Sequence, residues 1–301
     1  ATGVGSLGFA GKARQVVRMR IDSHVHVWAP KDQASKYPFA GSLAGSSAKN
    51  EPPMPGHASI LLDEMAKAKV DKAVIIQPGN HLYDHSYVNS VLKEFPEKFY
   101  GMLLADPTQG GGGVAQLEDL VSRLGYRGVR FNPYLWPEGE KMNNQVGLEM
   151  YARAGELGVP VGHMPFKGLL LHIEEIKALL EASPATKCII DHFGFCKCSD
   201  SSSQEWQELL KLASYEQVYV KTSAFFRVSG EDYPYEDARK QVRVLVDTFG
   251  AQRILFGTDW PWVSEKEGYQ KAWQILEQGQ SVLTEEEKEW VYGKTATTLF
   301  S

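Results

Sequence analysis

Short apolar segments alternate along the chain with longer segments in which apolar residues recur at helical spacing. Eight of the apolar segments have the length and the turn-residue boundaries of buried parallel strands. They cover residues 19–27, 71–77, 99–105, 127–132, 158–163, 187–192, 217–222 and 252–258. Helical periodicity occupies 58–69, 85–95, 114–124, 145–157, 171–182, 204–213, 236–248 and 284–298. The pattern predicts eight strands, each followed by a helix.

Eight strand–helix units in succession are typical of an α/β protein with a (β/α)8 TIM barrel. Gly125, Gly158 and Gly250 lie within two residues after predicted helices, where glycine is favoured. A doubly wound open sheet is the alternative, but no Gly-x-Gly-x-x-Gly motif follows the first strand and no Walker sequence occurs. Since we find no internal repeat or linker, we expect a single barrel domain over 19–301, preceded by a flexible leader at 1–18.

Two further segments stand apart from this pattern. The first 20 residues contain four basic residues and no acidic residue. This resembles the end of an organelle transit peptide, and a disordered tail is the equal alternative. The longest irregular stretch, 29–56, follows the first strand, so we expect it to lie over the mouth of the barrel.

The composition limits the classes of partner. Of the 301 residues 43% are hydrophobic, the net charge is −5, and no run of basic residues occurs, so a nucleic-acid partner is not expected. No apolar run reaches the roughly 18 residues of a membrane-spanning helix. Cys188, Cys196 and Cys198 form no Cys-x-x-Cys pair and favour a reducing compartment inside the cell. We expect the cytoplasm, or a chloroplast or mitochondrion if the N-terminus is the remnant of a transit peptide. We expect a small-molecule substrate, and the oligomeric state stays open, a homo-oligomer included.

The candidate chemistry lies at the carboxyl ends of the predicted strands, where TIM barrels place their active sites. His24 and His26 end the first strand and, being two residues apart, share one face of it. Neutral imidazoles in this arrangement can converge on a zinc, manganese or iron ion. A chance His-x-His pair is the alternative.

Three more polar residues fall at equivalent positions. His163 ends the fifth strand, and His192 follows Asp191 at the end of the sixth. Alternation along a strand predicts that Asp191 points to the opposite face from His192, which would then point inward. Asp259, in "FGTDWPW", ends the eighth strand, where a buried carboxylate has to be paired or liganded. Lys221 ends the seventh strand, and Arg227 follows it without a role that we can assign.

Four motifs carry a resemblance to a known family. The stretches "DSHVHVW", "GVRFNP", "IIDHFG" and "ILFGTDWPW" resemble motifs of the amidohydrolase superfamily, and in particular the branch with 2-pyrone-4,6-dicarboxylate and sugar-acid lactonases. The resemblance extends from Ile21 to the C-terminus. It implies a TIM-barrel hydrolase that opens a lactone or related ring ester carrying a carboxylate.

The resemblance also implies roles for individual residues. His24, His26, His163 and Asp259 would bind one divalent metal ion, Zn²⁺ or alternatively Mn²⁺. His192 and Asp259 would be catalytic, with Asp259 as general base, and Arg130 would grip the substrate carboxylate. We also expect Gln77 and Trp28 to contact the substrate.

Two observations about the superfamily leave the metal content open, and two other classes of function remain possible. Binuclear members of the superfamily carry a bridging lysine on the fourth strand, but this strand ends in Arg130, so we expect one metal at most. Some lactonases of this branch work without a metal, so metal-independent catalysis also stays open. The rival function is a metal-dependent decarboxylase of aromatic or muconate-type carboxylates, and a non-catalytic binding protein is a third class.

Overall fold

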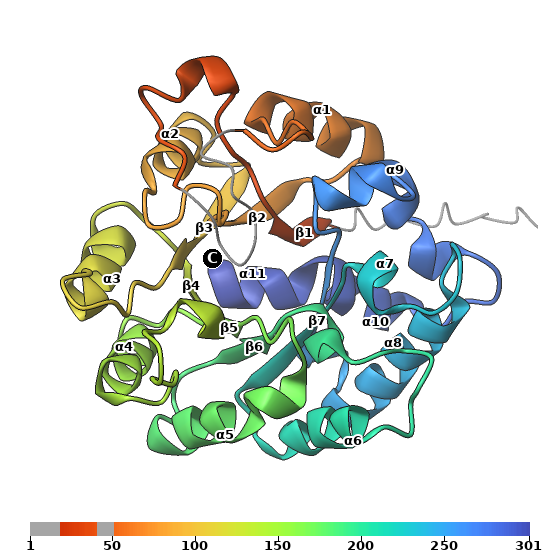
Figure 1. Cartoon of the computed structure of the whole chain (residues 1–301). Coiled ribbons are helices and arrows are strands. Elements are labelled where there is room, and N and C mark those ends of the chain that lie inside the picture. The colour runs from red at the N-terminus through yellow and green to blue at the C-terminus, as the bar shows by residue number, and fades with distance from the viewer. Residues whose placement is uncertain (1–18, 41–50) are drawn as a thin grey trace, which may run out of the picture.

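The computed structural model describes residues 19–40 and 51–301, which form a barrel of parallel strands surrounded by helices (Figure 1). The eight strands are neighbours in chain order. They are β1 (Ile21–Val25), β2 (Lys72–Ile76), β3 (Phe99–Leu104), β4 (Gly128–Phe131), β5 (Val161–His163), β6 (Cys188–Ile190), β7 (Val218–Ser223) and β8 (Ile254–Gly257). A parallel bridge between Val25 and Trp260 joins β8 back to β1. The predicted TIM barrel is confirmed.

Helices follow the strands on the outside of the barrel (Figure 1). The longer ones are α1 (Ala58–Ala68), α2 (Ser86–Glu94), α3 (Gly113–Ser122), α4 (Gln145–Glu156), α5 (Ile173–Ala182), α6 (Gln204–Lys211) and α8 (Glu236–Phe249). Two short helices, α7 (Phe225–Val228) and α9 (Tyr269–Ala272), lie in the loops after β7 and β8. The predicted helix over 284–298 is divided into α10 (Glu285–Glu289), a π-helical turn (Trp290–Lys294) and α11 (Thr295–Phe300).

The strands are buried on both faces, which explains their nearly continuous apolar sequences. One face of the sheet packs against the surrounding helices in the larger part of the core. The other face fills the inside of the barrel with the side chains of Ile21, Val74, Ile76, Met102, Ile189 and Leu255. Leu299 and Phe300 of α11 pack against this inner set, so α11 covers the end of the barrel opposite the carboxyl ends of the strands.

Some expectations concern segments outside the described residues. The predicted leader at 1–18 and residues 41–50 of the predicted mouth loop are among these. Within the described part of the chain, Cys188, Cys196 and Cys198 are buried free thiols. No helix in residues 19–40 and 51–301 has both the length and the apolar character needed to cross a bilayer.

Candidate active site

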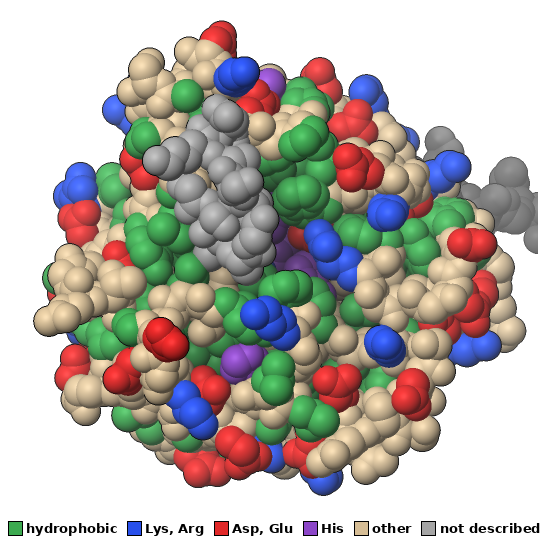
Figure 2. All heavy atoms as spheres, in the orientation of Figure 1, with side chains coloured by type: hydrophobic (Ala, Val, Ile, Leu, Met, Phe, Trp, Pro, Cys, Tyr) green, Lys and Arg blue, Asp and Glu red, His purple; other side chains and the backbone are tan. Residues whose placement is uncertain are grey.

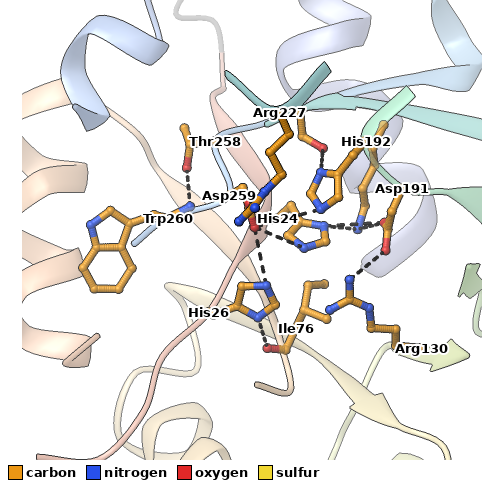
Figure 3. Close-up of polar contacts among 12 residues, drawn as sticks. His24, His26, Ile76, Arg130, Asp191, His192, Arg227, Thr258, Asp259 and Trp260 are labelled. Atoms are coloured by element: carbon orange, nitrogen blue, oxygen red, sulfur yellow. Dashed lines mark hydrogen bonds and ion pairs between the residues drawn. The ribbon is translucent and has the colours of Figure 1, made fainter. Parts of the chain in front are cut away.

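The seam between β8 and β1 positions the central residues of the site. The Asp259 N–H donates to the His24 carbonyl at 2.9 Å, and the His26 N–H donates to the Trp260 carbonyl at 2.7 Å. Asp259 has a φ of 63°, in the left-handed region that a non-glycine residue adopts when the surrounding structure constrains it. The same backbone contacts that close the barrel therefore bring Asp259 beside His24 and His26 (Figure 3).

His24, His26 and Asp259 form a buried group whose spacing suits one metal ion. Their ligand atoms all lie within 4.8 Å of one another. Asp259 Oδ1 is 3.8 Å from His24 Nε2 and 3.5 Å from His26 Nε2. Tetrahedral ligands about 2 Å from zinc are about 3.3 Å apart, so small shifts would complete such a site. His26 Nδ1 lies 3.0 Å from the Ile76 carbonyl, which can only accept, so His26 keeps a lone pair on Nε2.

The Asp259 carboxylate is held in its ionised form. Burial by itself would raise its pKa, but His192, His26 and Arg227 together lower the pKa well below the usual range. Arg227, from α7, donates from Nε to Asp259 Oδ2 at 2.8 Å. His192 Nε2 is 4.0 Å from Oδ1. Asp259 is therefore a negatively charged group that can bind a cation or accept a proton.

Asp191 and His192 both turn toward the interior, which corrects the expectation that they point to opposite faces. The reason is that β6 ends at Ile190, and His192 has a φ of 49°, so the alternation of a strand no longer applies. His192 Nδ1 is 2.7 Å from the Ser223 hydroxyl, and burial lowers the pKa of His192 to about 4. His192 is therefore a neutral imidazole near neutral pH.

A cavity of about 270 Å³ opens above this group at the carboxyl ends of the strands. Charged and polar side chains line it together with apolar ones. The lining residues are His26, Gln77, Gly79, Leu104, Arg130, Asn132, Met164, Phe166, His192, Phe195, Arg227, Asp259 and Trp262. Figure 2 shows histidine side chains deep in a hollow of this face, bordered by hydrophobic and basic side chains.

Two of the expected substrate contacts line this cavity and the third does not. Arg130 is almost fully buried and lies 3.4 Å from Asp191 through Nη2. Gln77 donates from Nε2 to the carbonyls of Leu82 and Asp84. The indole ring of Trp28 lies instead beside Trp262, with 5.7 Å between ring centroids, and Trp262 is the one that lines the cavity.

His163 lies apart from the other predicted metal ligands. It is paired in register with Phe131, whereas the inward-pointing Arg130 is paired with Gly162. Since neighbours in register point to the same face, His163 follows Phe131 outward toward α4, where its ring lies 5.9 Å from that of Tyr151. Neither ring nitrogen has a hydrogen-bond partner among the described residues. His163 therefore lies on the other face of β5 from the group of His24, His26 and Asp259.

Comparison with known proteins places this barrel in a family. Residues 21–301 match a protein-family model described as Amidohydrolase. The chain belongs to the amidohydrolase family. It is 25% identical over 243 residues to 4-sulfomuconolactone hydrolase of Rhizobium radiobacter, which covers 80% of this chain and 75% of that protein. It is 27% identical over 258 residues to 2-pyrone-4,6-dicarboxylate hydrolase of Comamonas testosteroni, covering 80% and 76%.

Solved structures share the fold of this amidohydrolase at low sequence identity. A probable 2-pyrone-4,6-dicarboxylic acid hydrolase from Acinetobacter baumannii with citric acid bound has a TM-score of 0.75, 18% identity and coverage of 93% of this chain and 98% of that chain. An amidohydrolase from Burkholderia multivorans with bound zinc has a TM-score of 0.66, 18% identity and coverage of 94% and 100%. A 2,6-dihydroxybenzoate decarboxylase from Rhizobium has a TM-score of 0.65, 13% identity and coverage of 94% and 98%. The fold alone therefore does not separate hydrolases from decarboxylases.

The amidohydrolase site contains three charged residues that the sequence did not assign to it. Arg227 contacts Asp259, and Lys221 lies 3.1 Å from Asp191 through Nζ. For Asp191 and Lys221 the available signal was a charged residue at the end of an apolar strand, where burial requires a partner. For Arg227 the sequence offered only proximity to the seventh strand.

Proposed function

We propose that this amidohydrolase hydrolyses a lactone, or a related ring ester, that carries an anionic group. The observation that carries the proposal is Asp259, an ionised buried carboxylate at the floor of a cavity that also contains Arg130 and Arg227. Two curated relatives, each about a quarter identical, are hydrolases of lactone-type substrates. Both the general base and the two arginine side chains of the cavity suit such a substrate.

Asp259 would act as the general base. It accepts a proton from a water molecule as the water oxygen attacks the ester carbonyl carbon. The carbonyl oxygen takes up negative charge, and an imidazole N–H of His24 or His192 at the same floor can stabilise it. When the ring C–O bond breaks, Asp259 returns the proton to the alkoxide that leaves. One water is consumed, and the product is an open-chain hydroxy acid.

The site also fits a divalent metal ion, which His24, His26 and Asp259 would hold. Such an ion, when bound, polarises the ester carbonyl and lowers the pKa of water. Two imidazoles and a carboxylate suit Zn²⁺ or Mn²⁺, and the zinc-containing relative structure supports this choice. His26 is already oriented for the task, because its bond to the Ile76 carbonyl leaves Nε2 free to ligate.

Arg130 and Arg227 would bind the anionic group of the substrate. A guanidinium can grip a carboxylate or sulfonate through two parallel N–H bonds. Arg130 is buried and Arg227 is partly exposed, so they lie at different depths of the cavity. The walls contributed by Phe166, Phe195 and Trp262 suit a flat ring between these charges. The structural relative with bound citric acid, a tricarboxylate, is consistent with this assignment.

The proposal is tested by offering the purified protein a panel of lactones, with 4-sulfomuconolactone and 2-pyrone-4,6-dicarboxylate beside a neutral lactone of similar size. We expect hydrolysis of an anionic member, and its loss in Asp259→Asn. The exposed Asp247→Asn is the matched control and should retain full turnover, since Asp247 contacts Arg243 far from the cavity. Wild-type turnover in Asp259→Asn would refute the assigned base. Release of CO₂ from an aromatic acid, without incorporation of water, would assign the protein to the decarboxylases instead.

A further inference from the structure

Tyr134 connects two loops at the carboxyl ends of the strands. It lies in the short turn Pro133–Leu135 after β4, and its hydroxyl oxygen accepts the backbone N–H of Lys167 at 2.7 Å. Lys167 belongs to the β5–α5 loop, residues 164–172, which joins β5 to α5. The Lys167 ammonium also lies over the Tyr134 ring, 4.7 Å from its centroid. One side chain from the loop after β4 therefore anchors the middle of the β5–α5 loop.

The Tyr134 hydroxyl is itself oriented by a chain of hydrogen bonds. Glu175, on α5, accepts the Met142 N–H at 2.9 Å through Oε2, and its Oε1 is 3.2 Å from His172 Nδ1. Burial by itself would raise the pKa of Glu175, but the bonds from His172 and from the Met142 N–H lower it. An ionised carboxylate only accepts, so His172 donates from Nδ1. The Nε2 atom of a neutral His172 then accepts the Tyr134 O–H at 3.3 Å, which leaves the Tyr134 oxygen to accept from Lys167.

The β5–α5 loop carries Phe166, which lines the cavity of the candidate active site. The Phe166 side chain is 45% exposed although it is large and apolar. Its ring contacts the rings of Tyr134 and Phe195 edge to face, with 5.3 and 6.2 Å between the ring centroids. These contacts and the bond to the neighbouring Lys167 N–H fix the place of the ring. A ring that stays exposed at a cavity is available to pack against a ring of a ligand.

We propose that Tyr134 is a positioning residue that anchors the β5–α5 loop through its hydroxyl, so that Phe166 packs against the ring of the bound substrate and favours a flat ring. A flat unsaturated ring contacts the Phe166 ring over its whole face, whereas a puckered saturated ring contacts it with fewer atoms. The preference comes from Phe166, and Tyr134 acts through it. The inference rests on the proposed function only in taking this cavity as the substrate site.

The anchor of the loop can be measured by itself. We suggest amide hydrogen exchange followed by NMR in the wild type and in Tyr134→Phe, which removes the hydroxyl and keeps the ring. The Lys167 N–H loses its acceptor and should exchange about tenfold faster, as expected for the loss of one hydrogen bond. Tyr215→Phe is the matched control, because it removes a hydroxyl that donates to the exposed Glu181, and it should leave the exchange of Lys167 unchanged. Wild-type exchange of the Lys167 N–H in Tyr134→Phe would overturn the proposal.

The preference for a flat ring can be measured without a reaction. Isophthalate and cis-cyclohexane-1,3-dicarboxylate carry the same two carboxylates on a flat and on a puckered ring, and titration calorimetry gives the Kd of each. We expect the wild type to bind isophthalate roughly two- to tenfold more tightly, the usual contribution of one aromatic pair. This preference should disappear in Phe166→Ala and become smaller in Tyr134→Phe. In the Phe166→Ala background, Tyr134→Phe should cause no further change, because the two residues act as one unit.

Three results of the calorimetry would contradict the proposal. The first is a wild type that does not prefer isophthalate or does not bind it. The second is an undiminished preference in Tyr134→Phe. The third is an equal effect of Tyr134→Phe with and without the Phe166 ring, since Tyr134 would then act through another group.

These measurements are independent of catalysis. If no lactone is hydrolysed but the exchange of Lys167 and the binding of the two dicarboxylates are as expected, the proposed function fails and the role of Tyr134 stands. If lactones are hydrolysed but Tyr134→Phe keeps the wild-type exchange and preference, the proposed function stands and the role of Tyr134 fails.

Discussion

The Thr258 hydroxyl donates to Asp22 Oδ2 at 2.6 Å across the seam that closes the barrel. Asp22 Oδ1 also accepts the backbone N–H groups of Thr258 at 3.0 Å and of His24 at 3.1 Å. One buried carboxylate therefore ties the strand of the histidine pair to the residue that precedes Asp259. The relative position of His24 and Asp259 depends on this brace as well as on the main-chain contacts.

We predict that Asp22→Ala lowers both stability and activity. The substitution leaves buried donors unpaired, at a cost of about 1–3 kcal/mol for each. It also frees His24 and Asp259 to move apart, so turnover should fall further than the loss of folded protein explains. Urea unfolding and kinetics on the folded fraction measure the two effects. Thr258→Val is the milder control, since it removes the hydroxyl and keeps the backbone donor. Wild-type stability and turnover in Asp22→Ala would show that this carboxylate is not needed to hold the site.

Arg130 and Arg227 should contribute to the hydrolysis of anionic substrates far more than to that of neutral ones. Loss of a hydrogen bond to a charged group costs about 1.5–3 kcal/mol, which is roughly 10- to 100-fold in affinity. We expect Arg130→Gln to lower kcat/KM by such a factor for an anionic lactone and much less for a neutral one. The comparison of the two substrates in one variant separates binding of the anion from damage to the fold. Equal losses on both substrates would contradict the assigned contact.

The pH dependence of stability should reflect His163. Burial lowers the pKa of His163 to about 4, from about 6.5 in the unfolded chain. Between these pH values the unfolded chain binds a proton that the folded protein does not, so stability is complete above pH 6.5 and falls as the pH decreases toward 4. His163→Phe removes this contribution and should flatten the stability curve over that window. Thermal unfolding from pH 4 to pH 7 measures it, and an unaltered slope would argue against a buried neutral His163.

Zinc should stabilise the folded protein through His26 and not through His163. A ligand that binds only the folded state raises the unfolding temperature, and the stabilisation grows with the logarithm of the ligand concentration relative to its Kd. We expect added zinc to raise the unfolding temperature of the wild type and of His163→Phe, and to have no such effect on His26→Ala. A loss of the zinc effect in His163→Phe would return His163 to the metal group.

Much of the fold was predictable because hydrophobic periodicity reports local structure directly. Each predicted strand overlaps an observed one, and the alternation of strands with helices allowed only a few topologies. The errors lie at the ends of elements. The sixth predicted strand extends through His192, whereas β6 ends at Ile190 and the backbone at His192 is left-handed. Such a local reversal depends on tertiary contacts that periodicity does not express.

The sequence by itself determined that histidines and a carboxylate stand at the carboxyl ends of strands, because that placement follows from strand order alone. Only the tertiary structure decided which of them meet. The register of β4 and β5 places His163 on the outer face together with Phe131. The contacts between the ends of β8 and β1 place Asp259 beside His24 and His26. The contact between Lys221 and His24 joins residues 197 positions apart in the chain. The groups around the His24 ring are therefore set by the closed barrel, which brings distant strands together, and not by the residues beside His24 in sequence.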